Sequence, residues 1–505
     1  MLPKAENSWT IFEAAHLLNR AGFGGSPKDV RDLHALGRER AVDSLIQPTE
    51  ALDAFPIPTW AGEEQALADV RTAIEKRRTL QSTIREMSAE DAENAKREAG
   101  KDMQQENRQR GLEAQSWWFL RMLKTRAPLR EKLTLFWHDH FATSIQKVKE
   151  PVLLVQQNEL FRKQAFGSFK ELTQDVLLDP AMVLYLDTES SKKGHPNENF
   201  AREVMELFTL GEGNYTEQDV SEAARAFTGY QFNRRNGKVL HNTRQWDPGD
   251  KTIFGKTGAY SGKEAIGLIF QKPQAARFMA NKLWEFFVYE KPSKAALDLL
   301  TESFVKSDLR VGPLLREIFL SQEFYSESAI RSQVKCPIQF MVQILKQLEI
   351  SDPPTAFPLA AQQQLGQVLF MPPNVAGWDW GQAWINTNTL FTRYNLAGFI
   401  TTSSNSNSLV PNNDAMKAKG KGPAKRMARS WKGPDYEKIA PRPLREKPTD
   451  LVDSLVFRFF QSPVPEKARK SFLEYAIQKK GAVFTDHETA ELCHLMLSTP
   501  YYQLT

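Results

Sequence analysis

The stretch from Glu63 to Arg110 constrains the fold most, because strong helix formers dominate it and it is too charged to lie in a core. Its apolar positions are too sparse for a sustained heptad seam. A break is expected between Met87 and Asp91, where Ser88 can cap a second helix. The sequence therefore predicts a solvated arm, either one long helix or a helical hairpin, with partner binding as its less favoured role.

Most of the remaining chain shows the apolar periodicity of amphipathic helices, as in Ser8–Arg20. The exception is the stretch 231–260, where Asn236-Gly237 separates two short β-like runs and favours a two-residue hairpin turn. The predicted fold class is mainly α. We expect a multi-helical globular protein with a small β-hairpin excursion and a protruding helical arm.

Shifts in composition predict how the chain is organised. Polar runs such as SSNSNS and the basic run KAKGKGPAKRMARSWK indicate a flexible basic linker before the last helices. The expected units are N-terminal core helices (1–62), the charged arm (63–111), a main helical domain (112–400) with a β-rich insert (231–260), the linker (401–448) and C-terminal helices that pack back on the core (449–505).

The net charge, the length of the apolar runs and the cysteine content exclude several classes of protein. A formal charge of +5 over 505 residues is too weak to indicate specific nucleic-acid binding. No apolar run is long enough to span a membrane, and no signal peptide is expected. The native compartment stays open between the cytoplasm, as the default, and the periplasm. Cys336 and Cys493 lie far apart in apolar, helix-like contexts and are expected to be free, buried thiols.

The richest chemistry lies in the stretch 197–230, NENFAREVMELFTLGEGNYTEQDVSEAARAFTGY. Glu198, Arg202 and Glu206 are spaced four apart and share a helix face, while Glu203 and Glu206 can converge on one point. The two glutamates are candidate catalytic or metal-binding carboxylates, with Arg202 as an anion clamp. The favoured alternative is an ion-pair network in which Arg202 neutralises Glu198 and Glu206. Asn197 and Glu198 are candidate ligand-binding residues.

A second candidate is the sequence WHDH, which contains His138, Asp139 and His140. An imidazole from either histidine could join two carboxylates to bind manganese, iron or zinc. On a regular helix, however, residues two apart point about 200° away from each other and could not share a metal, whereas on an extended or terminal turn they could. The alternative is that each histidine is a satisfied core residue.

A third candidate is the loop after Met371, which carries three tryptophans. Trp378 and Trp384 could form a stacking surface, with Asn374 and Asn386 supplying hydrogen bonds. The favoured alternative is a rigid loop whose indoles are buried in the core of the domain. His16 and Arg20, four apart on one helix face, are further candidate ligand-binding residues.

Five characteristic blocks are spread over nearly the whole chain. In order, they are HLLNRAGFGGSP, PLREKLTLFWHDHFATS, the 197–230 stretch, MPPNVAGWDWGQAWINTNTLFTRYNLA and LSTPYYQL. Together they resemble the bacterial family filed as domain of unknown function 1800. The resemblance implies a mostly helical protein and establishes no reaction. It also implies a partner, because members often accompany a second uncharacterised, sulfatase-like exported family.

The chain departs from this family at one position. Where members usually have a His-Asp pair before a lysine-containing strand, this sequence has Trp246-Asp247. The role of that histidine is therefore in question here. His241 lies five residues earlier and could substitute only if the loop folds back.

Two functions follow as expectations. The first is a metal-assisted hydrolase or oxidoreductase with a Glu/His/Arg site and a divalent metal as cofactor. The second is a non-catalytic partner or scaffold for an exported or surface protein, which would use the arm and the tryptophan loop.

Overall fold

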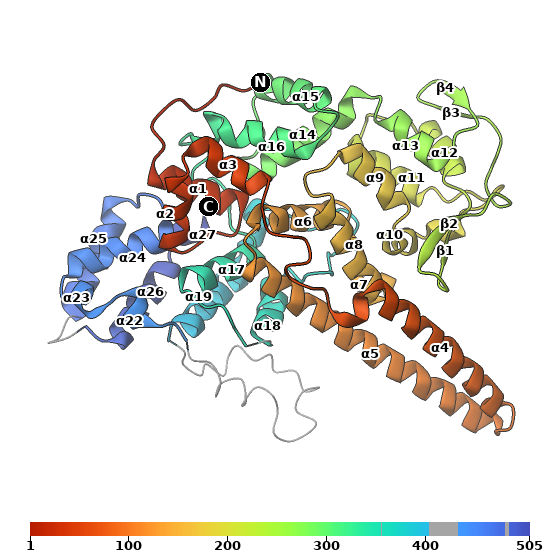
Figure 1. Cartoon of the computed structure of the whole chain (residues 1–505), viewed down its shortest axis with the longest axis horizontal. Helices are drawn as coiled ribbons and strands as arrows, with labels where there is room; N and C mark the ends of the chain where they lie inside the picture. The colour runs from red at the N-terminus through yellow and green to blue at the C-terminus, as the bar shows by residue number, and fades with distance from the viewer. Residues whose placement is uncertain (355, 403–432, 480–483) are drawn as a thin grey trace.

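The structure is a computed structural model, and it describes residues 1–354, 356–402, 433–479 and 484–505. Helices dominate, and two small antiparallel hairpins lie at one side of the body (Figure 1). The predicted fold class is confirmed. Within the described ranges, no helix is both long and apolar enough to cross a membrane.

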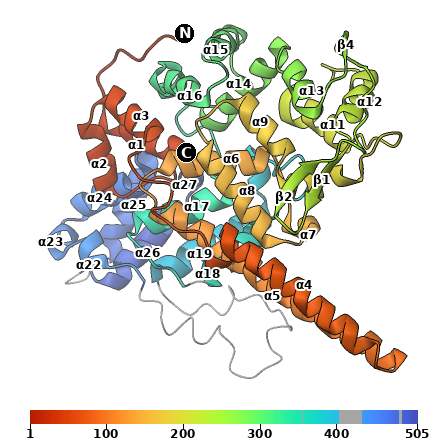
Figure 2. The same ribbon diagram turned by 45° about the vertical axis from the view of Figure 1, so that its right-hand side comes forward.

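The chain begins with three helices that lie beside the C-terminal helices in both views (Figures 1 and 2). The amide of Gln461 donates to the carbonyl of Gly25 at 2.7 Å and joins the two ends of the chain. The N-terminal elements are α1 (Ile11–Ala21), α2 (Pro27–Ala35), α3 (Arg38–Ile46) and the 3-10 turn η1 (Thr59–Ala61). The C-terminal elements are α22 (Tyr436–Ile439), α23 (Arg442–Arg445), α24 (Pro448–Phe460), α25 (Glu466–Lys479), α26 (Asp486–Leu497) and α27 (Pro500–Gln503).

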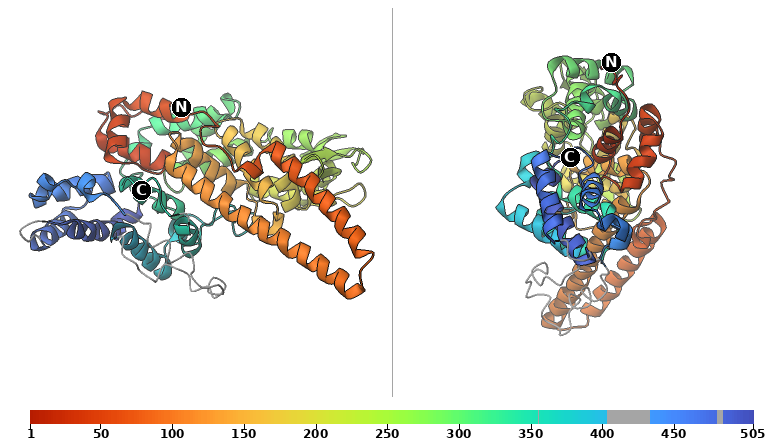
Figure 3. Two further views of the ribbon diagram at one scale, coloured as in Figure 1. Left: turned by 60° about the horizontal axis from the view of Figure 1, so that its bottom comes forward. Right: turned by 90° about the vertical axis from the view of Figure 1, so that its left-hand side faces the viewer.

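The predicted arm is a hairpin of α4 (Glu63–Ile84) and α5 (Ala89–Lys124), which projects well beyond the body (Figure 3). The hydroxyl of Ser88 accepts from the amide of Asp91 at 3.2 Å, so the break and its cap lie where the sequence predicts them. No residue of α4 is buried. Packing therefore contributes little to the arm beyond its base, and helix propensity must hold it together.

The base of the arm is fixed by a buried ion network. Glu131 accepts from Arg121 Nε at 2.9 Å and from Arg162 Nε at 2.6 Å, and all three side chains are almost completely buried. The indole of Trp118 donates to the same carboxylate at 3.2 Å. A buried carboxylate shared by two arginines ties α5 to the helices that carry Glu131 and Arg162, because desolvated charges must stay paired.

The body of the protein is a set of helices around one core. Before the strands come α6 (Pro128–His140), α7 (Ile145–Val148), α8 (Pro151–Lys163), α9 (Phe169–Leu177), α10 (Pro180–Tyr185), η2 (Thr188–Ser190), α11 (Asn199–Glu203), the π-helix η3 (Val204–Thr209) and α12 (Glu217–Ala226). After the strands come α13 (Gly262–Ile269), α14 (Pro273–Phe287), α15 (Lys294–Lys306), α16 (Val311–Leu320), η4 (Glu323–Tyr325), α17 (Pro337–Gln347), α18 (Ala356–Leu365), η5 (Gly381–Trp384) and α19 (Thr387–Thr402).

The strands are β1 (Tyr230–Asn233), β2 (Lys238–His241), β3 (Lys251–Ile253) and β4 (Lys256–Gly258). In the first hairpin Asn233 pairs with Lys238, so four residues form the turn, and the predicted two-residue turn at Asn236-Gly237 is wrong. A two-residue turn occurs instead in the second hairpin, where Phe254 and Gly255 both have positive φ.

Most of the predicted linker, 401–448, lies outside the described residues. Its described C-terminal part contains the short helices α22 and α23, so residues 433–448 are not an extended tether. Tyr436 is buried there, and its hydroxyl donates to the carbonyl of Thr401 at 2.6 Å. The linker prediction missed these helices because the apolar residues that anchor them are few and widely spaced.

Replacing Glu131 by glutamine should lower the free energy of unfolding by about 3–5 kcal/mol, because two buried guanidinium groups lose their shared charge partner. Chemical denaturation at neutral pH measures this change. Asp32→Asn is the matched control, since it removes an exposed ion pair with Lys28 and should leave stability almost unchanged. Equal effects of the two substitutions would contradict a structural role for the buried network.

Candidate functional site

The tryptophan loop closes over the carboxylate of Asp139 on α6. The backbone N–H of Trp378 donates to Asp139 Oδ1 at 2.7 Å, and the indole N–H of Trp380 donates to Oδ2 at 2.6 Å. Gly377 approaches so closely that a Cβ there would collide with Asp139, and its φ of +86° also favours glycine. Two of the predicted candidates, WHDH and the tryptophan loop, therefore meet at one carboxylate.

Burial raises the pKa of Asp139 from its ordinary value of 3.8 to about 6. The hydrogen bonds from Trp378 and Trp380 oppose this shift, as does the nearby charge of Lys282, while Asp379 adds to it. A carboxyl group with this pKa exchanges its proton near neutral pH, which an ordinary surface aspartate does not.

His140 lies between a carbonyl and an amine. Its Nε2 is 3.0 Å from the carbonyl oxygen of Phe208 on the π-helix, and its Nδ1 is 3.2 Å from Lys282 Nζ on α14. A carbonyl can only accept, so Nε2 carries the proton and the lone pair of Nδ1 faces the amine. Burial and the charge of Lys282 lower the pKa of His140 well below its ordinary value, which keeps the ring neutral.

Lys282 forms no ion pair with any residue that the structure describes, and its one polar contact there is with His140. Its ammonium also lies 5.3 Å from the centre of the Phe278 ring. Burial lowers the pKa of Lys282, an effect that the charges of Asp139 and Glu285 oppose. The site therefore holds an amine and a carboxyl group whose pKa values are shifted toward each other.

His138 faces the opposite way from His140 on the regular helix α6. Its ring packs against Trp118, Phe370 and Trp378, and its Nε2 has no hydrogen-bond partner among the described residues. Burial lowers its pKa to about 3. Because α6 stays helical through His140, the two rings point apart and are not placed to share a metal. Across the described ranges, no three His, Cys, Asp or Glu side chains are placed to hold a metal ion.

The predicted network around Arg202 is met in part, since Glu198 is a partner and Glu217 takes the place expected for Glu206. Arg202 forms a bidentate pair with Glu217 at 2.8 and 2.7 Å and a weaker contact with Glu198 at 3.3 Å. The prediction that it neutralises Glu206 is wrong. Glu217 lies on α12, and the turn between the helices brings it back beside α11, which helical spacing alone could not reveal.

Glu206 instead accepts a hydrogen bond from the hydroxyl of Tyr215. Burial raises the pKa of the neighbouring Glu203, and the charge of Glu206 adds to the shift. The π-helix that carries Glu206 also supplies the Phe208 carbonyl to His140, so the carboxylate stretch borders the site through its backbone. π-Helical turns occur often at functional sites.

The predicted asparagines hold turns together. The side chain of Asn197 donates to the carbonyl of Asp187 at 3.1 Å, and that of Asn374 accepts from the amide of Ala376 at 2.8 Å. Asn386 accepts from the amide of Thr389 at 2.9 Å and caps α19. Trp378 and Trp384 are 5% and 6% exposed, so the loop presents neither indole as a stacking surface.

His16 and Arg20 lie apart from this site. His16 Nε2 is 2.9 Å from the carbonyl oxygen of Phe324, and burial lowers the pKa of this histidine to about 3. Arg20 donates to Ser332 Oγ at 2.6 Å and to the carbonyl of Ala329. Both side chains tie α1 to the segment after α16.

The loop that carries Trp246 does fold back. The ring of His241 stacks on Tyr230 and meets the edge of Trp246, with ring centroids 5.7 Å apart for the second pair. The ammonium of Lys251 lies 4.7 Å from the centre of the Trp246 ring and donates to the carbonyls of Asp247 and Gly249. His241 thus occupies space beside the position where the family resemblance expects a histidine.

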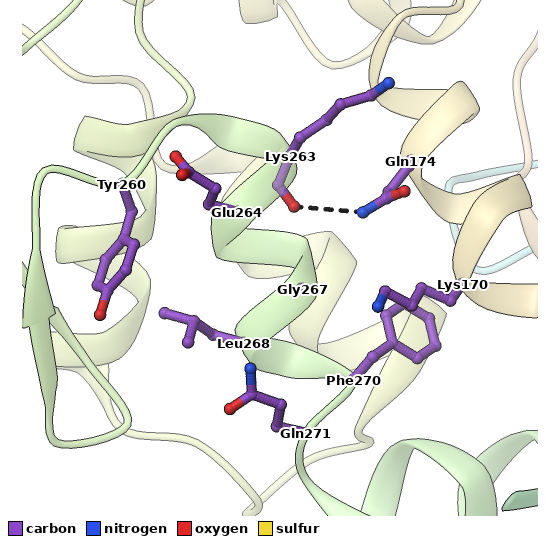
Figure 4. Close-up of a pocket in the computed structure, with 9 residues that line it drawn as sticks. All are labelled: Lys170, Gln174, Tyr260, Lys263, Glu264, Gly267, Leu268, Phe270 and Gln271. Carbon is purple, nitrogen blue, oxygen red and sulfur yellow. Dashed lines mark hydrogen bonds between the residues drawn. The ribbon is translucent and has the colours of Figure 1, made fainter. Parts of the chain in front are cut away.

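Two surface hollows lie away from the site around Asp139. One, of about 450 Å³, opens between α9 and α13 (Figure 4). Its lining includes Lys170, Gln174, Tyr260 and Glu264, and none of the predicted site residues. A second hollow, of about 470 Å³, lies at the base of the arm and includes Trp117 and Leu359 in its lining.

Two residues of the site escaped the sequence-based prediction. Asp139 was considered only as the residue between two histidines, and Lys282 lies in an ordinary amphipathic helix, PQAARFMANKLWEFF. The one available signal for Lys282 was a lysine among apolar and aromatic neighbours. Such residues more often extend their charge to solvent.

Gly377→Ala should destabilise the protein by about 3 kcal/mol or more, because the alanine meets both a positive φ and the carboxylate of Asp139. Gly37→Ala is the matched control: its φ is +79° and nothing lies within 4 Å of the added Cβ, so it should cost only about 1–2 kcal/mol. Urea titrations of the two variants separate backbone strain from the collision. Equal losses would show that the loop does not close tightly on Asp139.

The raised pKa of Asp139 should make stability fall as pH rises. Between pH 3.8 and about 6 the folded protein holds a proton that the unfolded chain has lost, so the free energy of unfolding should decrease by up to about 1.4 kcal/mol per pH unit. Asp139→Asn should flatten the profile in this window. The variant is compared with the wild type at each pH, because Asp179, whose pKa is raised to about 7 by burial, contributes a similar slope to both. A steeper profile in the variant would contradict the shift.

Comparison with known proteins identifies the family. The model of the family described as protein of unknown function, DUF1800, matches residues 16–504. No curated protein and no solved structure matches the chain. The matched range includes α6, the π-helix, α14 and the tryptophan loop, and so the whole site around Asp139. This chain belongs to the DUF1800 family.

Proposed function

We propose that this protein is a hydrolase that uses acid–base chemistry without relying on the glutamates predicted to bind a metal. Asp139 acts as the general base that activates water, and the ammonium of Lys282 stabilises the negative charge that develops on the substrate oxygen. His140 fixes the position of Lys282. The observation that carries the proposal is the partly buried amine of Lys282, which contacts a neutral imidazole and pairs with no described carboxylate.

The environment of Asp139 supports its role. A general base works best when its pKa lies near the working pH, and burial brings the pKa of Asp139 to about 6. Each carboxylate oxygen accepts one hydrogen bond from the tryptophan loop and keeps a lone-pair direction for a water molecule. The carboxylate is also oriented, since its two donors come from a loop that closes on it.

The environment of Lys282 supports a role in binding negative charge. A buried cation without a paired carboxylate gains free energy when an anionic group approaches. The neutral ring of His140 accepts one hydrogen bond from the amine and adds no charge of its own. The remaining N–H groups of Lys282 are therefore free to point toward a developing oxyanion, which is the geometry that stabilises such transition states.

Arg202 and Glu206 of the 197–230 stretch have partners of their own. Arg202 is paired with Glu217 and Glu198, and Glu206 accepts from Tyr215. We assign Arg202 to helix packing and leave the catalytic roles to Asp139 and Lys282. A divalent metal is not part of this mechanism.

A second candidate function, that of a binding partner or scaffold, is favoured by the arm. A helical hairpin in which α4 buries no residue presents nearly all its surface to other molecules. The association with a sulfatase-like exported protein, which the family resemblance implies, stays a prediction.

The hydrolase activity is tested with three probes: 4-nitrophenyl acetate, 4-nitrophenyl phosphate and 4-nitrophenyl sulfate. We expect turnover of at least one of them, with kcat/KM rising with pH through about 6 as Asp139 loses its proton, and falling when Lys282 loses its own. Asp139→Asn should reduce kcat by about 10²–10⁴-fold. Lys282→Met should reduce it by about 10²–10³-fold.

Glu206→Gln is the matched control, because it changes a carboxylate near the site that the proposal leaves without a catalytic role. It should retain nearly full activity and the same pH profile. Wild-type protein that hydrolyses none of the three probes, or Asp139→Asn with unchanged kcat, would overturn the proposal.

A further inference from the structure

Three arginines form a line along α4, from its ninth residue to its C-cap. Arg71, Arg78 and Arg85 recur every seven residues, so they lie on nearly the same face of the helix. At 1.5 Å of rise per residue, successive guanidinium groups start about 10.5 Å apart along the axis. Arg85 is the C-cap residue and retains helical backbone angles, so the spacing holds over the whole line.

These side chains are available for binding. All three are exposed, and none forms an ion pair with a residue in the described ranges. The ion pairs of the hairpin gather instead near its base, where Arg110 contacts Asp69 and Glu106 at 2.7 Å each. The tip therefore carries unpaired positive charge on an element that projects from the body (Figure 3).

The local charge is positive over the same segment. Residues 71–86 contain five basic side chains, with Lys76 and Arg77 in addition to the line, and two acidic ones. A set of unpaired guanidinium groups at a fixed spacing complements carboxylates repeated at the same spacing, because arginine and carboxylate pair bidentately. Helices with glutamates at heptad positions provide that spacing.

The neighbouring helix argues against nucleic acid as the occupant. The part of α5 that runs beside this segment has an excess of negative charge. Its three basic side chains, Lys96, Arg97 and Lys101, are outnumbered by six exposed acidic ones: Glu90, Asp91, Glu93, Glu98, Asp102 and Glu106. These carboxylates would repel a phosphate backbone that approached the arm closely. A single partner helix with both acidic and neutral positions carries less negative charge than a phosphate backbone and is repelled less.

We infer that the line of Arg71, Arg78 and Arg85 is a docking surface for an acidic helix of a partner protein. The helix lies along α4 and places carboxylates opposite the three arginines. Because the contact is exposed and mainly electrostatic, it should form quickly and weaken as salt is added. The inference does not depend on the chemistry at Asp139.

The test uses a labelled helical peptide of three heptads, with glutamate at one heptad position and alanine and glutamine elsewhere, and full-length protein. Fluorescence anisotropy measures Kd at low and at physiological salt. We expect binding to the wild type and a loss of about 3- to 150-fold for Arg71→Gln/Arg78→Gln/Arg85→Gln, because three exposed ion pairs are lost.

Lys96→Gln/Arg97→Gln/Lys101→Gln is the matched control, since it removes the same charge from the neighbouring helix. Its Kd should stay close to that of the wild type. Far-ultraviolet circular dichroism checks that both triple variants keep the hairpin, which glutamine, a good helix former, favours. Equal losses in the two variants, tighter binding of duplex DNA or of anionic vesicles than of the peptide, or no binding at low salt would each overturn the inference.

Discussion

The carboxylate of Asp139 is the contact on which the candidate site depends. Its two oxygens accept from the backbone of Trp378 and the indole of Trp380, and so join α6 to a loop that is distant in sequence. A buried carboxylate must satisfy its hydrogen bonds within the protein. Asp139 therefore fixes where the loop lies, while burial raises its pKa and the two hydrogen bonds from the loop oppose that rise. One contact sets both the geometry and the chemistry of the site.

The helices were predictable from the sequence because their signals are local. The arm was recognisable from its composition, its break from Ser88, and the start of α12 from Thr216 and Asp219, which form a capping box. The hairpin near Asn236 was recognisable as a hairpin, although its turn is longer than predicted. Caps, turns and helix propensity act over a few residues, and so a single sequence carries them.

The site was less predictable because its contacts join distant segments. Spacing on one helix paired Arg202 with Glu206, whereas the structure pairs it with Glu217 on the next helix. Nothing near Lys282 in sequence shows that it meets His140. The sequence did restrict the candidates to the stretches that surround the site, since WHDH, the carboxylate stretch and the tryptophan loop each supply part of it. It could not show which atoms face one another, because that depends on how the helices pack.

The length of α5 has a mechanical consequence. It is a single helix of 36 residues, about 54 Å long, that runs from the exposed tip of the arm to the buried Arg121 without a break. Arg121 is paired with Glu131, and Glu131 lies on α6, the same helix that carries Asp139. The body end of this long helix is thus anchored by a buried ion pair. A force applied at the far end of the arm is carried along this unbroken helix to the Arg121–Glu131 pair, and through that pair to α6.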